Sequence, residues 1–169
     1  MGQPFTTIVD FAHTPNALKV AIESAREMTK GRVIALFGSA GLRDKEKRRL
    51  MAEVSAEQAD LTVLTAEDPR TESLSGILSE MAEGAIDKGG IENKTFWRVE
   101  DRGQAILFAL QLASPEDIVL VCGKGHEQSM CFGETEYPWD DLIATRAALG
   151  KFLGIDDAPE MPYLPTQEK

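Results

Sequence analysis

The sequence predicts an α/β domain with a Rossmann-like, three-layer architecture, in which a mostly parallel sheet of about six strands carries helices on both faces. Short apolar runs alternate with stretches that repeat apolar residues at helical spacing. Two of the runs, 33–37 and 118–122, are almost wholly apolar, which is typical of strands buried on both faces. Glycine-rich or charged clusters follow the runs, where parallel sheets bind their ligands.

The first half of the chain contains three strand–helix units. Thr14 and Pro15 are expected to begin the first helix, because threonine caps helices and proline fits their first turn. Asp44 is expected to cap the second helix, and the glycine pair 89–90 to end the third. The strands are expected at 6–10, 33–37 and 61–65, and the helices at 14–30, 44–59 and 73–88.

The second half continues the alternation. Asp101 is expected to cap a helix at 102–112, and Asp140 or Asp141 to cap a last helix within 139–153. A short strand at 129–132 should turn at Gly133. The remaining strands are expected at 95–99 and 118–122. We expect residues 1–5 to be the remnant of an interdomain linker, 6–154 to form the domain, and 155–169, rich in proline and charge, to be a loose tail.

Composition and charge exclude several classes of protein. A length of 169 residues favours one domain. The net charge is −10, whereas broad nucleic-acid binding needs a basic face. No apolar run reaches the roughly 18 residues of a membrane span, and no signal peptide opens the chain. The two cysteines, Cys122 and Cys131, form neither a disulfide framework nor a metal motif, so a reducing, cytoplasmic setting is expected.

Four clusters of polar residues come directly after predicted strands. Because the carboxyl ends of parallel strands meet at one edge of a sheet, we expect these clusters to converge there. They are the segments 10–13, 38–49, 67–70 and 123–127. None has the spacing of a zinc site, and Cys122 is expected to be a buried, inert thiol.

The first two clusters contain groups suited to a nucleotide. Asp10 can accept hydrogen bonds from ribose hydroxyls and His13 can donate to a nucleotide, although the same residues also fit a turn and helix cap. The glycine-rich loop 38–44 leads into a helix, as in phosphate-binding loops, but it is neither a Walker A motif nor a dinucleotide fingerprint. The basic residues at 43–49 fit either anion binding or a solvated helix face.

The other two clusters contain a guanidinium suited to a carboxylate and glycines that leave room for a ligand. Arg70 can bind a carboxylate through two parallel hydrogen bonds. The alternative is a surface pair between Asp68 and Arg70 of little energetic value. In the last cluster, Gly123 and Gly125 allow a ligand to approach the backbone closely.

Taken together, the four clusters resemble the C-terminal domain of the Mur ligase family. The family pattern runs D-Y-A-H-T-P, G-x-G-G-D-R-D-x-x-K-R, D-N-P-R and G-K-G-H-E. This chain has D-F-A-H-T-P at 10–15, G-S-A-G-L-R-D-K-E-K-R at 38–48, E-D-P-R at 67–70 and G-K-G-H-E at 123–127. The likeness covers residues 3–154 and is greatest to the branch that adds the third amino acid of the peptidoglycan stem peptide.

The resemblance implies a role in ATP-dependent amide-bond formation. Members of this family have three domains, and the central one carries the phosphate-binding loop and most of the magnesium chemistry. This chain has no Walker A motif, so the likeness implies an excised third domain that is inactive alone. The implied partners are ATP, magnesium, the UDP-N-acetylmuramoyl dipeptide, an amino acid and the missing N-terminal and central domains.

The resemblance also implies roles for single residues, none of them catalytic or metal-binding. The nucleotide would contact Asp10 and His13, phosphate would be neutralised by Lys47 and Arg48, and the incoming amino acid would lie among Arg43, Asp68, Arg70, Gly123 and Glu127.

Three departures from the family pattern leave the added amino acid open. Phe11 replaces tyrosine, Leu42 replaces the aspartate before Arg43, and residues 67–68 are Glu-Asp instead of Asp-Asn. We expect Arg70 to favour an amino acid with a distal carboxylate, of the diaminopimelate type, over lysine. A polyglutamate- or cyanophycin-type ligase, or a binding module without catalysis, remains an alternative.

Overall fold

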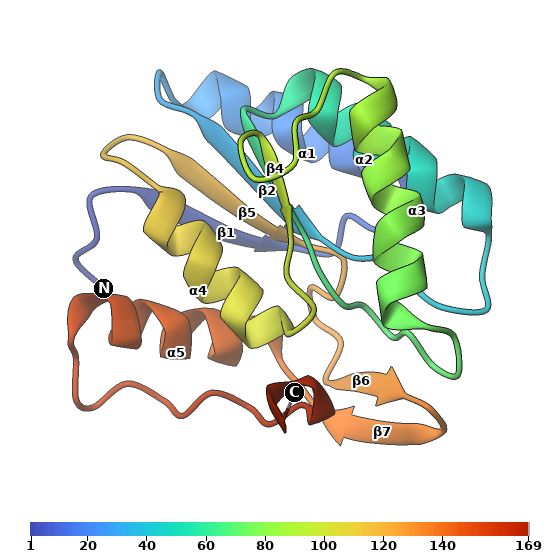
Figure 1. The fold of residues 1–169 in the computed structure, drawn as a ribbon. Helices are drawn as coiled ribbons and strands as arrows, with labels where there is room; N and C mark the ends of the chain where they lie inside the picture. Colours follow the sequence, from blue (N-terminus) through green and yellow to red (C-terminus); the bar gives the residue numbers. More distant parts are fainter. Residues whose placement is uncertain (169) are drawn as a thin grey trace.

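A five-stranded parallel sheet in the order β1-β5-β2-β3-β4 forms the centre of the computed structural model, which describes residues 1–168 (Figure 1). This arrangement confirms the predicted α/β class. The strands are β1 (Thr6–Asp10), β2 (Val33–Phe37), β3 (Leu61–Leu64), β4 (Phe96–Arg98) and β5 (Ile118–Cys122). β5 lies between β1 and β2, so the order in which the strands are added reverses beside β2. In α/β proteins, ligands bind at the carboxyl ends of the strands at such a switch point.

The sixth predicted strand does not join the main sheet. Instead β6 (Ser129–Phe132) pairs antiparallel with β7 (Thr135–Pro138) in a separate hairpin. The short connection through Gly133 explains the antiparallel pairing, because a two-residue loop can join only antiparallel strands.

Helices cover both faces of the sheet. Alternate residues of β2 and β5 point to opposite faces, so Phe37 packs in one hydrophobic core and Leu36 in the other. One face carries α1 (Pro15–Met28), α2 (Lys45–Gln58) and α3 (Leu74–Asp87), and the other carries α4 (Arg102–Leu112) and α5 (Asp141–Leu153) (Figure 1).

Side-chain caps fix where the helices begin. Thr14, Asp44 and Asp101 cap α1, α2 and α4 as predicted, each accepting a hydrogen bond from a backbone amide of the first turn. Asp140 caps α5, so Trp139 lies outside that helix. The indole of Trp139 is buried and donates to Asp141 Oδ1 over 2.8 Å.

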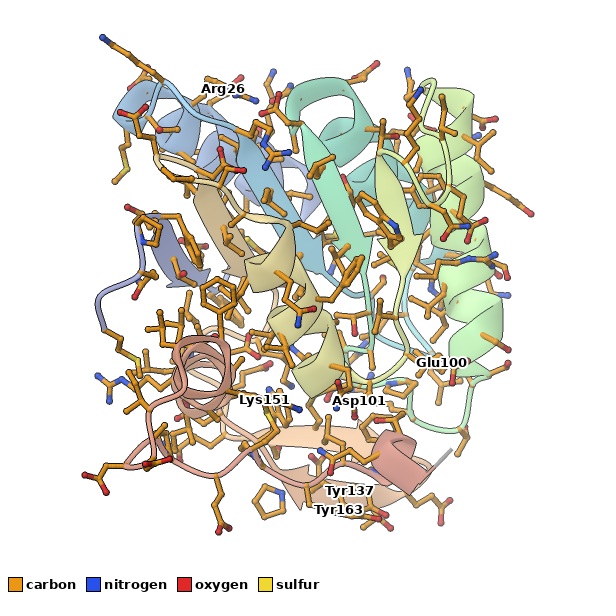
Figure 2. The ribbon with its side chains drawn as sticks, turned by 60° about the vertical axis from the view of Figure 1, so that its left-hand side comes forward. Arg26, Glu100, Asp101, Tyr137, Lys151 and Tyr163 are labelled. Carbon is orange, nitrogen blue, oxygen red and sulfur yellow. The ribbon has the colours of Figure 1, made fainter. Side chains whose placement is uncertain are left out.

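The C-terminal segment is packed against the domain, in contrast to the loose tail expected from composition. Leu164 is buried. Thr166 lies within the short helix η1 (Pro165–Glu168), and its hydroxyl donates to Asp101 Oδ2 over 2.6 Å. Figure 2 shows Tyr163 beside Tyr137 of the hairpin, with ring centroids 6.1 Å apart. Composition was misleading because a few well-placed side chains anchor an otherwise polar segment.

Residues before β1 also contribute to the packing. Phe5 is buried and its ring meets that of Phe152 edge-on, with centroids 5.6 Å apart. The domain limits at 6 and 154 stay a prediction. Among residues 1–168, none of the helices combines the length and the apolar character needed to cross a bilayer.

A buried ion pair joins the strand ends to α5. The guanidinium of Arg102 bonds both carboxylate oxygens of Asp141 over 2.7 Å, and both side chains are fully buried. The same group donates to the carbonyl oxygens of Ala66 (3.1 Å) and Cys122 (2.8 Å). It therefore ties together the carboxyl ends of β3 and β5, which flank β2.

Candidate functional site

The four polar clusters meet at the carboxyl edge of the sheet, as predicted. They surround a cavity of about 380 Å³. All but two of the predicted site residues line it: His13, Arg43, Lys47, Asp68, Arg70, Gly123 and Glu127. The lining is completed by Phe11, Ala40, Asp44 and Glu67.

Asp10 lies next to this cavity instead of in it. It lines a neighbouring cavity of about 540 Å³, and Phe11 borders both. One oxygen of the exposed Asp10 carboxylate accepts the Ala12 amide over 2.7 Å. The ring of Phe11 lies between His13 and His126, with centroid distances of 4.3 and 4.8 Å, so three rings form one surface at the junction of the two cavities.

Arg48 is not brought to the cavity. Its guanidinium is fully buried and bonds Glu72 and Glu80, whereas its neighbour Lys47 lines the cavity. Successive residues of a helix point about 100° apart, so only one of the two can face a given cavity. The geometry therefore gives Arg48 a structural position between α2 and the start of α3.

Lys124 was not predicted as a site residue, although it lies within the G-K-G-H-E motif. Its buried ammonium is 3.0 Å from Asp68 Oδ2 and 2.8 Å from Glu127 Oε2. Asp68 also accepts the backbone amide of Cys131 over 2.9 Å. The negative charge of Asp68 is therefore paired with Lys124 and not with Arg70.

Arg70 is held by the β6–β7 hairpin. Its amide donates to Cys131 O over 3.0 Å, and its carbonyl accepts the Gly133 amide over 2.7 Å. The guanidinium donates to Gly41 O over 3.0 Å. With φ of +54° the backbone of Arg70 is in the left-handed region, where such strain is often associated with function.

Glu67 is a second residue that sequence reasoning did not assign to the site. Its side chain is buried, and no partner is found for Oε2 among the described residues. A Cβ at position 123 would overlap this carboxylate, which explains the need for Gly123 there. Burial raises the pKa of Glu67 to about 7, against the opposing charges of Arg102, Lys47 and Lys124. The substitution of Glu for Asp in the motif was the only sequence signal.

The charges of the cavity suit an amino acid. Arg43, Lys47 and Arg70 offer cationic groups to carboxylates or phosphate. Glu127 is partly exposed and offers a carboxylate to an ammonium group. Within residues 1–168, no group of three or more His, Cys, Asp or Glu side chains is arranged to hold a metal ion. Burial raises the pKa of the Cys122 thiol to about 12, which keeps that thiol inert.

The raised pKa of Glu67 predicts a specific pH dependence of stability. The Glu67 carboxyl binds its proton more tightly in the folded protein than in the unfolded chain. The contribution of this protonated carboxyl to the free energy of unfolding is therefore full below about pH 4.5 and is lost as the pH rises to about 7. Glu67→Gln should remove this loss. Relative to the wild type, the variant should gain about 3 kcal/mol in free energy of unfolding between about pH 5 and about pH 8.

Chemical denaturation of both proteins at the two pH values measures this gain. Glu83→Gln, at an exposed position of α3, is the matched control and should show almost none. Equal pH dependence in wild type and Glu67→Gln would contradict the prediction.

Comparison with known proteins identifies similar sequences. The family model described as "Mur ligase, glutamate ligase domain" matches residues 1–125. The UDP-N-acetylmuramyl-tripeptide synthetase of Roseiflexus sp. (strain RS-1) is 46% identical over 150 residues, which are 89% of this chain and 30% of that protein. The UDP-N-acetylmuramoyl-L-alanyl-D-glutamate--2,6-diaminopimelate ligase of Alkaliphilus metalliredigens (strain QYMF) is 40% identical over 154 residues, 91% of this chain and 30% of that protein.

Solved structures agree with these matches. A structure of a UDP-N-acetylmuramoyl-L-alanyl-D-glutamate--2,6-diaminopimelate ligase superposes with a TM-score of 0.83 at 31% identity, covering 90% of this chain and 31% of that one. An ADP complex of Escherichia coli FolC reaches 0.50 at 24% identity over 69% of this chain and 25% of that one, which concerns the fold alone. The chain thus spans about 30% of the length of the relatives named here.

Proposed function

The chain belongs to the Mur ligase family, and from this premise we propose that it is the amino-acid-binding domain of an ATP-dependent ligase. The ligase would add the third amino acid to the UDP-N-acetylmuramoyl dipeptide during peptidoglycan synthesis. The observation that carries the proposal is the convergence of Arg43, Arg70 and Glu127 on one cavity at the sheet's switch point. Two cations and one carboxylate complement the carboxylates and ammonium of an amino acid.

The domain's part in the reaction is to bind and orient the amine. Arg43 and Arg70 would hold carboxylates of the incoming amino acid, while Glu127 attracts its ammonium group. After losing a proton, the nitrogen held in this way could attack the activated carboxyl carbon of the dipeptide, and the bond from that carbon to the activating phosphate would break as the amide forms. Both oxygens of Asp68 are bonded by Lys124, and one of them also accepts the Cys131 amide, so we assign Asp68 to holding Lys124 and the hairpin rather than to binding a distal ammonium. Glu127 contacts the same Lys124 through Oε2 but is more exposed, so we assign the substrate ammonium to it.

The residues beside the cavity fit one part of ATP. Asp10 has a carboxylate oxygen left for a ribose hydroxyl, and the exposed Phe11 ring, flanked by His13, offers a flat surface. Lys47 lies where it can neutralise phosphate. When bound, ATP would supply the phosphoryl group that activates the carboxylate. The described residues offer no cluster that could hold magnesium, so we assign the phosphate-binding loop and most of the magnesium chemistry to the central domain of the full-length ligase.

The cationic side chains make an amino acid with a distal carboxylate the preferred substrate. Arg70 lines the cavity, and the charge of Asp68 is paired with Lys124 instead of with Arg70. A distal ammonium, as in lysine, would face Arg70 as a like charge.

The isolated chain should fold without performing catalysis. We expect a cooperative thermal transition, because each face of the sheet has its own buried core. We expect no release of phosphate from ATP above background, because no Walker A motif is present in its sequence. Calorimetric melting and a phosphate-release assay with magnesium test this. Sustained magnesium-dependent turnover by the isolated chain would refute the excised-domain assignment.

A further inference from the structure

A carboxylate outside the cavity fixes the loop that carries Arg43. Glu72 lies just before α3, and its Oε2 accepts the Leu42 amide over 2.9 Å. Both of its oxygens also accept the two Arg48 nitrogens over 2.6 Å. One carboxylate therefore joins the glycine loop, α2 and the approach to α3.

Arg48 completes this connection from the other side. Its fully buried guanidinium donates to Ala40 O over 3.2 Å and to Glu80 Oε2 over 3.0 Å, in addition to Glu72. Glu72 and Glu80 thus share one guanidinium. Of these two glutamates, and among the bonds of residues 1–168, only Glu72 also accepts from the loop backbone.

The rest of the loop is held equally closely. The Gly41 amide donates to Asp68 O over 2.9 Å, and a Cβ at position 41 would overlap the Pro69 carbonyl. The next residue, Leu42, has φ of +55°, and its side chain is 63% exposed. An apolar side chain facing solvent on a left-handed backbone has no packing of its own to hold it there. The hydrogen bond from its amide to Glu72 is the side-chain contact that holds Leu42 itself in this conformation.

From these contacts we infer that Glu72 is a positioning residue for amino-acid binding, acting through the Leu42 amide to aim Arg43 into the cavity. The inference rests on the proposed function, because it takes Arg43 as a ligand of the incoming amino acid. Arg48 supports the bond between Glu72 and the Leu42 amide electrostatically. Its hydrogen bonds lower the pKa of Glu72 to about 2, so the carboxylate stays charged at neutral pH.

Kinetics of the full-length ligase carrying Glu72→Gln test the inference. The variant keeps the side-chain size but loses the charge, and in either orientation its amide NH2 group faces a donor nitrogen of Arg48. We expect the KM for the amino acid to rise about tenfold, with kcat and the KM for ATP nearly unchanged. Glu80→Gln is the matched control, since Glu80 also bonds Arg48 and its KM should stay at the wild-type value.

A double-mutant cycle with Arg43→Ala separates the possible failures. If Glu72 acts through Arg43, then Glu72→Gln should add almost nothing to the KM once Arg43 is gone. Equal effects of Glu72→Gln with and without Arg43, or an effect no larger than that of Glu80→Gln, would overturn the inference. If Arg43→Ala itself leaves the amino-acid KM unchanged, the proposed function fails instead.

Hydrogen exchange in the unmodified ligase tests the same contact without a substitution. The Leu42 amide should exchange at least about tenfold more slowly than in an unstructured peptide, although its side chain faces solvent. Exchange at the peptide rate would show that Glu72 does not hold this loop.

Discussion

Asp141→Asn is expected to lower the free energy of unfolding by about 3–5 kcal/mol. The substitution removes the charge that balances Arg102, and both side chains are fully buried. Burial alone would lower the pKa of Arg102, yet Asp141 raises it above its usual range, so the guanidinium stays charged. An uncompensated buried cation is the cause of the expected loss.

Urea denaturation of the isolated chain measures the effect. The matched control is Asp87→Asn, which removes one charge from the exposed pair with Arg49 at 3.4 Å. That pair should contribute less than about 1 kcal/mol. Similar losses for the two variants would mean that the Arg102–Asp141 pair is no more important than a surface contact.

Arg70→Ala should remove the preference of the full-length ligase for an amino acid with a distal carboxylate. A guanidinium–carboxylate pair in a closed site is worth about 1.5–3 kcal/mol, or roughly 10- to 150-fold in selectivity. The measurement is the ratio of kcat/KM for diaminopimelate to that for lysine, before and after the substitution. We expect the ratio to fall mainly through diaminopimelate.

The control for this experiment is Arg49→Ala. Arg49 belongs to the basic stretch 43–49 but is paired with Glu53 and Asp87 on the helix surface, so the ratio should not change. A wild-type preference for lysine, or an unchanged ratio in Arg70→Ala, would refute the assignment of Arg70 to a distal carboxylate.

Much of the fold could be predicted because its signals are local. The apolar runs at 33–37 and 118–122 are fully buried strands, and the caps Thr14 and Asp44 begin their helices as expected. A cap or an apolar run needs only its neighbours in sequence to be recognised. The hairpin at Gly133 was predicted as a turn for the same reason, but whether its strand would join the main sheet was not a local question.

The sequence predicted which loops form the site better than it predicted what each residue in them does. The order of the sheet brings the loops together, so most of the expected residues line one cavity. The sequence pattern predicts that Arg48 binds phosphate, because nothing in the sequence shows that Glu72, 24 residues away, forms an ion pair with it. Lys124 and Asp68 form a pair across 56 residues, which is equally invisible in sequence.

The shared guanidinium of Arg102 bears on how such a domain can change its substrate over evolutionary time. Ala66, just after β3, and Cys122, the last residue of β5, each accept a hydrogen bond from this one flat, rigid group. A displacement of either strand end alone would break one of the hydrogen bonds to Arg102, so the spacing of the two ends is constrained. The loop at 40–42 is instead held in part by the partly exposed Glu72, whose exchange leaves Arg48 still paired with Glu80. New specificities should therefore arise by substitutions around that loop, while the strand ends keep their spacing.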